Sequence, residues 1–387
     1  MIPIIDGHLD IAMNALLYER DQTAELSALW QRETGGVDDG RGVATLTLPE
    51  LKDSAVMLVM ATVITRCKPW IDPKRIIKRS DLDYPDPAMT YAAAQGQLAY
   101  YQQLQCDRQI RIIQTRSQLD AHVEQWLAPG IVQPNLLQET TNLKNVAQCE
   151  LTPGIIIMME GADPIVHPQQ VHEWYRQGMR CLSLAHFGHS RYAAGTPSPE
   201  PTSPEQDGPL TDLGRELLKQ MEELNIILDL SHLSDTSFFQ AADAYHGPVC
   251  ATHANCRTIV PGSRQLTDEQ IKIIVQRSGI IGIAMHYAMI RPGAGNDLHP
   301  DDVTLNHVVE HIDHICQLAG SADCVGIGSD LDGGFGADAT PRDLQRYRDL
   351  RKLAPALDAR GFKEKDVVNL FYNNWLRFFR EALPPLT

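Results

Sequence analysis

The 387-residue sequence has no excess of basic residues, and this narrows the classes of protein to consider. Lys and Arg number 34 against 49 Asp and Glu, which gives a formal charge of −15 at pH 7. Binding to nucleic acid needs clustered Lys and Arg to neutralise phosphates. The charge balance therefore argues against a nucleic-acid partner, but it says little about substrate, because net charge reports on solubility more than on sites.

Long apolar segments are also missing. No uninterrupted apolar stretch reaches the ~18 residues that a membrane-spanning helix requires. The first residues, Met1 to Asp6, contain no basic segment followed by a long apolar run. We therefore expect no signal peptide in this chain, no membrane contact and a cytoplasmic location.

Paired cysteines are absent as well. The eight cysteines stand at scattered positions (67, 106, 149, 181, 250, 256, 316 and 324) and form no C-x-x-C pair. An even number is only a weak sign of disulfides in a chain of this length. We expect reduced, mostly buried thiols.

What the sequence does contain is a series of eight short apolar runs separated by helical stretches. The runs are Ile2–Ile5, Val56–Ile64, Ile155–Met159, Cys181–Leu184, Ile226–Leu230, Val249–Thr252, Ile280–Ala284 and Cys324–Gly328. Continuous rather than alternating hydrophobicity is typical of parallel strands that are buried on both faces. Hydrophobic residues at 43% allow a sizeable core.

Amphipathic segments lie between several of these runs, and they predict helices. Examples are Leu213–Leu224, Asp235–Tyr245, Asp268–Arg277 and Val303–Leu318. Eight strand–helix repeats predict one (β/α)8 TIM barrel domain over residues 1–387, with insertions in the loops at its C-terminal mouth. A doubly wound open sheet is the alternative fold.

Six of the eight runs end in, or lead directly into, a histidine or an acidic residue. The residues are His8 with Asp10, Glu160, His186, His232, His253 and Asp330. In a barrel the C-terminal strand ends converge on one mouth, where active sites lie. The pattern therefore predicts a single site.

The residue types and their spacing favour a metal site. His8 and Asp10 are two apart on a strand, so both side chains can face one ion, and imidazole with carboxylate suits zinc. Glu160 follows a fully apolar run, where a carboxylate is costly unless it is paired or bound. Its two oxygens can bridge two ions. His232 and His253 end consecutive strands and can complete a second metal position.

Other histidines have simpler interpretations. His307, His311 and His314 have helical spacing, but their segment lacks the H-E-x-x-H arrangement of helix-borne zinc proteases, so we interpret them as an ordinary helix face. His189, His286 and His299 receive no role. The Pro- and Gly-rich stretch 188–208 is interpreted as a lid or substrate-binding loop, or equally as a tolerated insertion. Residues 14–48 form a second insertion without an assigned role.

Several segments, in this order, resemble the renal-type (membrane) dipeptidase family. They are DGHLD, TLPEL near residues 46–51, the glutamate after the third run, GPLTDLGRELLKQMEELNIILDLSHLSD, ATHANCR, GIGSDLDGG and NLFYNNWLRFF. The resemblance covers nearly the whole chain. It implies a binuclear zinc site (other divalent ions are possible) on His8, Asp10, Glu160 as the bridge, His232 and His253.

The same resemblance implies three further roles. His186 matches the family's substrate-binding histidine, Arg264 the arginine that binds the substrate's terminal carboxylate, and Asp330 the acidic residue that transfers the proton. The residues alone do not single out Arg264, although guanidinium pairs bidentately with carboxylate. Many relatives have Glu-Gly-Gly-His after the third strand, whereas this chain has Glu160-Gly161-Ala162-Asp163, so narrow specificity is not carried over.

The expected function is that of a zinc-dependent dipeptidase that tolerates a D-residue at the C-terminal position and forms a homodimer. One rival is another amidohydrolase-like activity, such as an N-acyl-amino-acid hydrolase, a lactonase or a deaminase, because fold alone does not separate these. Many such enzymes use a carbamylated lysine after the fourth strand, where this chain has His186. A rival of a different class is a non-catalytic barrel in which metals serve only the structure.

Overall fold

Eight parallel strands close into a barrel. The computed structural model describes residues 2–34, 42–69, 82–128, 151–197, 207–293 and 299–386. The barrel strands are β1 (Ile4–Leu9), β2 (Val56–Val63), β6 (Gly154–Met159), β7 (Met179–Ser183), β8 (Ile227–Asp229), β9 (Val249–Ala251), β10 (Ile280–Ile283) and β11 (Val325–Ile327). Each strand pairs with the next in sequence, and β11 pairs with β1, so the sheet has no free edge. The expected TIM barrel is confirmed, and the open-sheet alternative is wrong.

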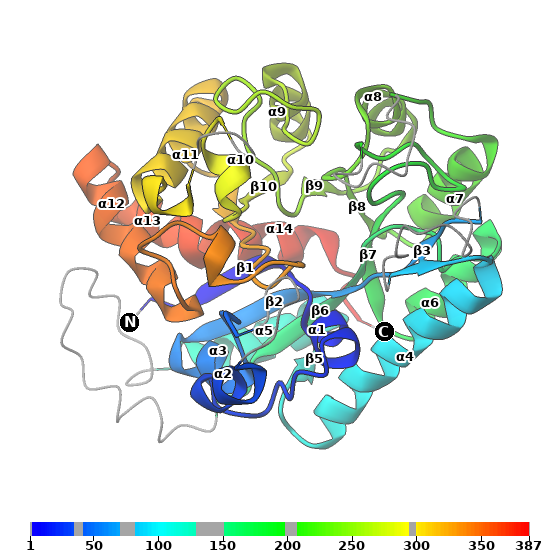
Figure 1. Ribbon diagram of the computed structural model, residues 1–387. Helices are drawn as coiled ribbons and strands as arrows, with labels where there is room; N and C mark the ends of the chain where they lie inside the picture. The colour runs from blue at the N-terminus through cyan, green and yellow to red at the C-terminus, as the bar shows by residue number, and fades with distance from the viewer. Residues whose placement is uncertain are drawn as a thin grey trace.

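Helices surround the barrel and connect its strands (Figure 1). They are α1 (Ile11–Leu17), α2 (Leu26–Glu33), α3 (Leu48–Asp53), α4 (Pro87–Cys106), α5 (Arg116–Trp126), α6 (Val171–Arg176), α7 (Asp212–Glu223), α8 (Asp235–Ala244), α9 (Asp268–Gln276), α10 (Tyr287–Ile290), α11 (Leu305–Ala319), α12 (Leu353–Arg360), α13 (Glu364–Val368) and α14 (Asn374–Ala382). Side-chain hydroxyls cap several of them; Thr211, for example, accepts from the Gly214 N–H at the start of α7. The four helices expected from the sequence are confirmed within two residues at each end.

Three short strands are additions to the expected pattern. Arg66–Cys67 (β3) and Asp83–Tyr84 (β4) form a separate two-stranded sheet. Arg111–Ile112 (β5) pairs with the start of β6. Each has only two residues, which is too short to produce a periodic signal in the sequence.

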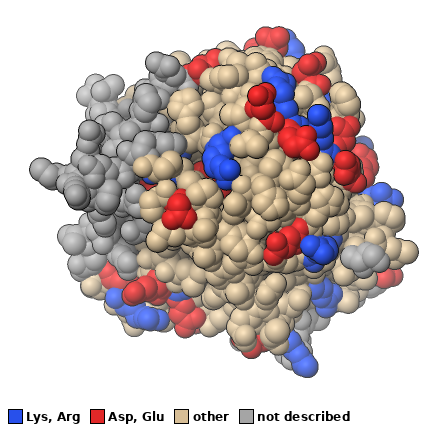
Figure 2. Space-filling view, turned by 90° about the vertical axis from the view of Figure 1, so that its right-hand side faces the viewer, with Lys and Arg blue, Asp and Glu red and all other residues tan. Residues whose placement is uncertain are grey.

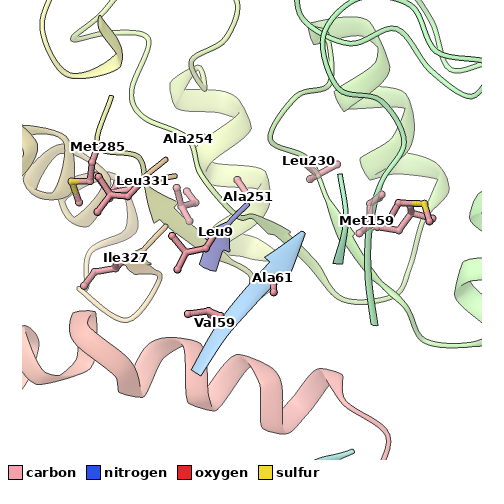
Figure 3. Packing of buried hydrophobic residues seen from close by; sticks show 14 of the residues in the cluster. Leu9, Val59, Ala61, Met159, Leu230, Ala251, Ala254, Met285, Ile327 and Leu331 are labelled. Carbon is pink, nitrogen blue, oxygen red and sulfur yellow. The ribbon is translucent and has the colours of Figure 1, made fainter. Parts of the chain in front are cut away.

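The two faces of the barrel strands belong to different parts of the core. In β6, Ile155, Ile157 and Met159 pack with the surrounding helices, as part of a large cluster seen in part in Figure 3. Ile156 and Met158 point the opposite way and join a second cluster that includes residues of α14. Because side chains alternate along a strand, the next residue in this inward phase is position 160.

Helix α14 closes the barrel at the end opposite the mouth. The Trp375 side chain is fully buried, and its indole N–H donates to the Ile327 carbonyl at 2.8 Å. A Cβ atom added to Gly7 or Gly326 would lie within 2.4 Å of the Trp375 ring. The two glycines therefore leave the space that this indole occupies beneath β1 and β11.

The surface carries charges of both signs. Figure 2 shows one face on which Lys and Arg side chains lie beside Asp and Glu side chains, with a central area of uncharged residues. None of the described helices is long and apolar enough to cross a membrane. The seven cysteines among the described residues are free, as expected, and five of them are buried; Cys149 lies outside the described residues.

Candidate metal centre

The predicted site residues converge at the C-terminal ends of the barrel strands. His8 lies near the end of β1, and Asp10 follows that strand directly. The other residues follow β6, β7, β8, β9 and β11, in the order Glu160, His186, His232, His253 and Asp330. The first strand begins later and runs longer than predicted, to Leu9, so His8 lies within the strand. Asp6 explains the extension, because its carboxylate accepts hydrogen bonds from Ser329 and Tyr347 and so joins β1 to β11 and its neighbourhood.

The first group of ligand atoms surrounds the imidazole of His8. Its Nε2 atom lies 3.5 Å from Glu160 Oε2, 3.8 Å from Asp10 Oδ1 and 3.8 Å from Asp330 Oδ1. The Thr62 hydroxyl donates to Asp10 Oδ1 and fixes that carboxylate. His8, Asp10 and Glu160 thus offer three ligand atoms within 4.8 Å of one another.

The second group lies on the other oxygen of Glu160. His232 Nε2 is 3.0 Å and His253 Nε2 is 3.4 Å from Glu160 Oε1, and the two histidine nitrogens are 2.9 Å apart. His253 also forms a ligand group with His8 and Asp330. Each oxygen of Glu160 therefore faces its own set of imidazole nitrogens, which is the arrangement a bridging carboxylate requires.

These separations fit metal binding. Two ligands ~2.1 Å from a tetrahedral zinc ion lie about 3.4 Å apart, close to the distances within both groups. His8 Nε2 is fully buried and has no hydrogen-bond partner among the residues that the structure describes. The residues present therefore suit a pair of divalent cations of the zinc type.

Electrostatics favour a cation at this place. Burial, together with the Asp10 and Glu160 carboxylates, raises the pKa of Asp330 well above its usual value. Burial and Glu160 likewise raise the pKa of Asp10 to about 6. Burial alone would lower the pKa of His8, but the carboxylates around it, Glu160 foremost, raise it to about 10. The crowding of three buried carboxylates is what positive charge would relieve.

Among the histidines and carboxylates of the cluster, Asp330 and His186 are more accessible than the rest. The side chains of Asp330 and His186 are 16% and 12% exposed, whereas those of His8, Glu160 and His253 are at most 2% exposed. Asp330 also has a left-handed backbone (φ 58°), and a Cβ atom on Gly333 would fall 2.0 Å from its Oδ1 atom. The turn after β11 therefore presents the Asp330 carboxylate at the open side of the ligand cluster.

His186 faces the cluster with one nitrogen and a cation with the other. Its Nε2 atom is 3.7 Å from Glu160 Oε1, and Nδ1 is 3.5 Å from the Arg66 guanidinium, which is itself paired with Asp83. A guanidinium is only a donor, so Nδ1 accepts and the ring proton lies on Nε2. Burial and the His232 ring lower the pKa of His186 well below its usual value, so the ring is neutral.

Arg264 is half-buried beside the second group. It donates to the backbone carbonyls of Ser231 and His253, at 2.8 and 2.9 Å, and its Nη2 atom lies 3.1 Å from His232 Nε2. The structure therefore brings Arg264 to the cluster, although only the family resemblance had selected it. The two backbone hydrogen bonds hold the guanidinium in place.

The histidines outside the cluster have structural partners. His311 accepts from the Cys256 N–H and donates to the Ile290 carbonyl, His307 caps the start of α11, and His314 contacts Asp268. The segment forms helix α11, as its spacing predicts, and that these histidines have no further role stays a prediction. His286 caps α10, and its side chain accepts from the Ala288 N–H.

Both insertions contact the site from outside. In the 14–48 insertion, Thr45 donates to the Asp332 carboxylate and Asn14 to the Asp332 carbonyl, two residues after Asp330. In the 188–208 stretch, the Thr196 N–H donates to the His232 carbonyl at 2.7 Å, whereas residues 198–206 lie outside the described residues. The segment after Glu160 departs from the family pattern, and its Asp163 carboxylate joins two other segments. It accepts from the Ser190 hydroxyl in the 188–208 stretch and from the Cys67 N–H in β3.

Several polar residues that support the cluster do not stand out in the sequence patterns described above. Asp229 is a fully buried carboxylate in the run 226–230. That is the signal by which Glu160 was found, and it could have identified Asp229 too. Thr252, the last residue of the sixth run, and Arg66 carry no such signal, because a threonine in a strand and an isolated arginine are common.

A parallel barrel with a cluster of histidines and carboxylates at its C-terminal mouth, suited to divalent cations, is typical of the metal-dependent hydrolase class of barrels. The family model for membrane dipeptidase (peptidase family M19) matches residues 1–383. The chain therefore belongs to the membrane dipeptidase family.

Individual relatives are similar over parts of the chain. A protein from the pqqA 5′ region of Klebsiella pneumoniae is 30% identical over 55% of this chain and 76% of its own length. The dipeptidase aclJ of Aspergillus oryzae is 29% identical over 58% of this chain and 51% of its own. The chain spans about half the length of most of the curated relatives it matches.

Solved structures share the fold along the whole chain. The M19 metallopeptidase called dipeptidase AC superimposes with a TM-score of 0.71 at 22% identity, over 99% of both chains. A Rhodobacter sphaeroides metallopeptidase, solved with a phosphinate mimic of the dipeptide L-Ala-D-Ala, has the same TM-score and identity over 98% of this chain and 99% of its own.

Proposed function

We propose that this protein is a metal-dependent dipeptidase with two zinc ions at the barrel mouth. The observation that carries the proposal is that the two carboxylate oxygens of Glu160 face different ligand groups. Oε2 faces His8, and Oε1 faces His232 and His253. Two divalent cations held by these groups would lower the pKa of a water molecule toward 7 and supply a nucleophile at neutral pH. Family membership supports the peptide bond as the target.

The remaining residues have distinct tasks in this reaction. Asp330 takes the proton of the attacking water at its carboxylate and returns it to the amine nitrogen of the leaving amino acid. His186 donates its Nε2–H to the carbonyl oxygen of the scissile bond, where negative charge develops. Its Arg66 partner supports this role, because a guanidinium at Nδ1 leaves the ring proton on the side of the cluster.

Arg264 is proposed to bind the C-terminal carboxylate of the dipeptide. Its guanidinium is held beside the ligand cluster by two backbone carbonyls, so little side-chain freedom is lost when substrate binds. A cation fixed beside the ligand cluster favours substrates whose scissile bond lies one residue from a free carboxylate. Tolerance of a D-residue at the C-terminal position is part of the proposal, and the R. sphaeroides complex with a mimic of L-Ala-D-Ala supports it. The homodimer and the cytoplasmic location stay predictions.

The test is the metal dependence of alanine release from Ala-Ala. We expect the activity to disappear after chelation and to return with zinc. The variant His232→Asn should lose more than about 100-fold in kcat/KM, since even residues that only support metal ligands are worth 10–100-fold. His307→Asn, a histidine exchange on α11, is the matched control and should behave as wild type. Full activity of the chelated protein, or equal activity of the two variants, would contradict the proposal.

A further inference from the structure

One hydroxyl group contacts two of the proposed metal ligands at once. Thr252 Oγ1 lies 3.2 Å from His8 Nδ1 and 2.9 Å from His253 Nδ1. The two imidazole rings are in contact, with centroids 3.7 Å apart, and all three residues are buried. Thr252 therefore lies between β1 and β9 on the side of both rings that faces away from Glu160.

The proton of this hydroxyl is committed to a third residue. Thr252 Oγ1 is 2.9 Å from Asp229 Oδ2, and an ionised carboxylate only accepts. The Ser231 hydroxyl, 3.2 Å from Thr252 Oγ1, gives its own proton to Asp229 Oδ1 at 2.6 Å. Thr252 therefore donates to Asp229 and keeps two lone pairs for the histidines.

Counting donors and acceptors then fixes both rings. A hydroxyl has one donor and two acceptor positions. With its donor used by Asp229, Thr252 can only accept from His8 and His253, so each ring carries its proton on Nδ1. A neutral ring, which is the form that binds a metal, then has its lone pair on Nε2, the atom that faces Glu160 in both residues.

We propose that Asp229 and Thr252 form a positioning relay that sets the tautomer of His8 and His253 together. Supporting groups of this kind usually bind one metal-ligating histidine each, by a carboxylate or a carbonyl. Here a single carboxylate acts through a single hydroxyl on one histidine of each ligand group. The inference rests on the proposed metal centre but not on the substrate.

Asp229 is fixed so that the relay has one direction. Its Oδ1 atom accepts from the Thr252 N–H, the Ser231 N–H and the Ser231 hydroxyl, which leaves Oδ2 for the Thr252 hydroxyl. In an Asp229→Asn variant, those three donors require the amide oxygen on their side. The amide NH2 group must then point at Thr252 and donate to it.

The Asp229→Asn exchange reverses the direction of the hydrogen bond between residue 229 and Thr252 without changing the shape of the side chain. Thr252 would accept from the amide and keep one lone pair and one proton for two histidines. One of the two rings must then accept at Nδ1 and carry its proton on Nε2, where it blocks a metal bond.

The test measures zinc affinity by chelator competition and ring protonation by NMR of zinc-loaded protein labelled with 15N-histidine. In wild type we expect protons on Nδ1 of His8 and His253. Thr252→Val, which keeps the shape but loses the hydroxyl, should bind zinc 10–100-fold more weakly. Thr252→Ser keeps the hydroxyl and should restore the affinity to within about threefold of wild type. Asp229→Asn should weaken zinc binding at least as much as Thr252→Val, and one of the two Nδ1 proton signals should vanish.

The outcomes separate the relay from general stability and from the proposed activity. The metal-free Thr252→Val and Thr252→Ser proteins should unfold at similar temperatures, so that the difference between them appears only with zinc. Unchanged zinc affinity in Thr252→Val and Asp229→Asn, or wild-type rings protonated on Nε2, would overturn the inference. No substrate enters these measurements, so a protein that binds zinc through the relay but cleaves no dipeptide would refute the proposed activity alone.

Discussion

Arg264 lies beside the ligand cluster with its guanidinium held by the carbonyls of Ser231 and His253. In Arg264→Ala we expect dipeptide binding to weaken by on the order of 2–5 kcal/mol, as when one partner of a buried charge pair is removed. The loss should appear mainly in KM, because the carboxylate is bound in the ground state and the transition state alike. Steady-state kinetics with Ala-Ala measure it.

Arg360 provides the control for this variant. It pairs with Asp313 of α11 at 2.6 Å, and its side chain is 51% exposed. Arg360→Ala also removes one guanidinium, and we expect its KM to stay near that of wild type. An unchanged kcat/KM in Arg264→Ala would remove Arg264 from the substrate site.

The sequence predicts residues at strand ends better than residues that support them. His8, Glu160 and His232 stand out because a polar side chain that ends an apolar run is costly without a partner. Thr252 is inconspicuous in the sequence, because a hydroxyl at a strand end has many uses. One of the two histidines that it contacts, His8, lies 244 positions earlier in the chain. Only the folded chain shows which distant donors meet at such a group.

The helix α14 supports the site from beneath the barrel. Trp375 packs against Gly7, the residue before His8, and its indole donates to the Ile327 carbonyl. In Trp375→Ala we expect a loss of 3–5 kcal/mol in the free energy of unfolding, typical of a large aromatic removed from a core. Urea unfolding of the metal-free protein measures this change.

Leu386, which follows α14 in the chain, provides the control for the stability change in Trp375→Ala. Leu386 is 73% exposed, so Leu386→Ala should change the free energy of unfolding by no more than about 0.5 kcal/mol. If the Trp375 variant were as stable as the Leu386 variant, α14 would not be part of the barrel core.

Elements are predictable where burial imposes a long pattern. The eight barrel strands were found because they are buried on both faces and therefore apolar throughout. The first strand was placed too early, because Asp6 and His8 look like a strand end in the sequence. In the structure Asp6 is satisfied by Ser329 and Tyr347 and lies inside the strand. The short strands β3, β4 and β5 depend on contacts with distant residues and leave no local pattern.

At the level of the whole molecule, stability should depend on pH through a histidine far from the metal centre. His122 is buried in α5, and its Nε2 donates to the Met57 carbonyl at 2.8 Å. Burial lowers the pKa of His122 from 6.5 to about 4. In the unfolded chain the His122 ring becomes protonated below pH 6.5, whereas in the folded chain it becomes protonated only near pH 4. The free energy of unfolding therefore falls as the pH drops through this window, and at pH 5 it is about 2 kcal/mol lower than at pH 7.

Urea unfolding of metal-free protein at pH 7 and pH 5 measures this contribution. His122→Gln keeps a donor for the Met57 carbonyl but cannot take up a proton, so it should lose about 2 kcal/mol less than wild type between the two pH values. The exposed His299, exchanged for Gln, should leave the difference as in wild type. Equal pH dependence in wild type and His122→Gln would show that His122 does not contribute.

The barrel, the ligand cluster and Arg264 support one central proposal: the protein cleaves the peptide bond of a dipeptide, which has a free amino group on one side and a free carboxylate on the other. The measurement that tests this most directly is amino-acid release by zinc-loaded protein from Ala-Ala, Ala-D-Ala, Ala-Ala-Ala and N-acetyl-Ala. We predict cleavage of both dipeptides and none of the tripeptide or the acyl compound. Cleavage of N-acetyl-Ala alone, or of none of the four, would contradict the claim and assign the metal centre to a different amidohydrolase activity or to a binding role.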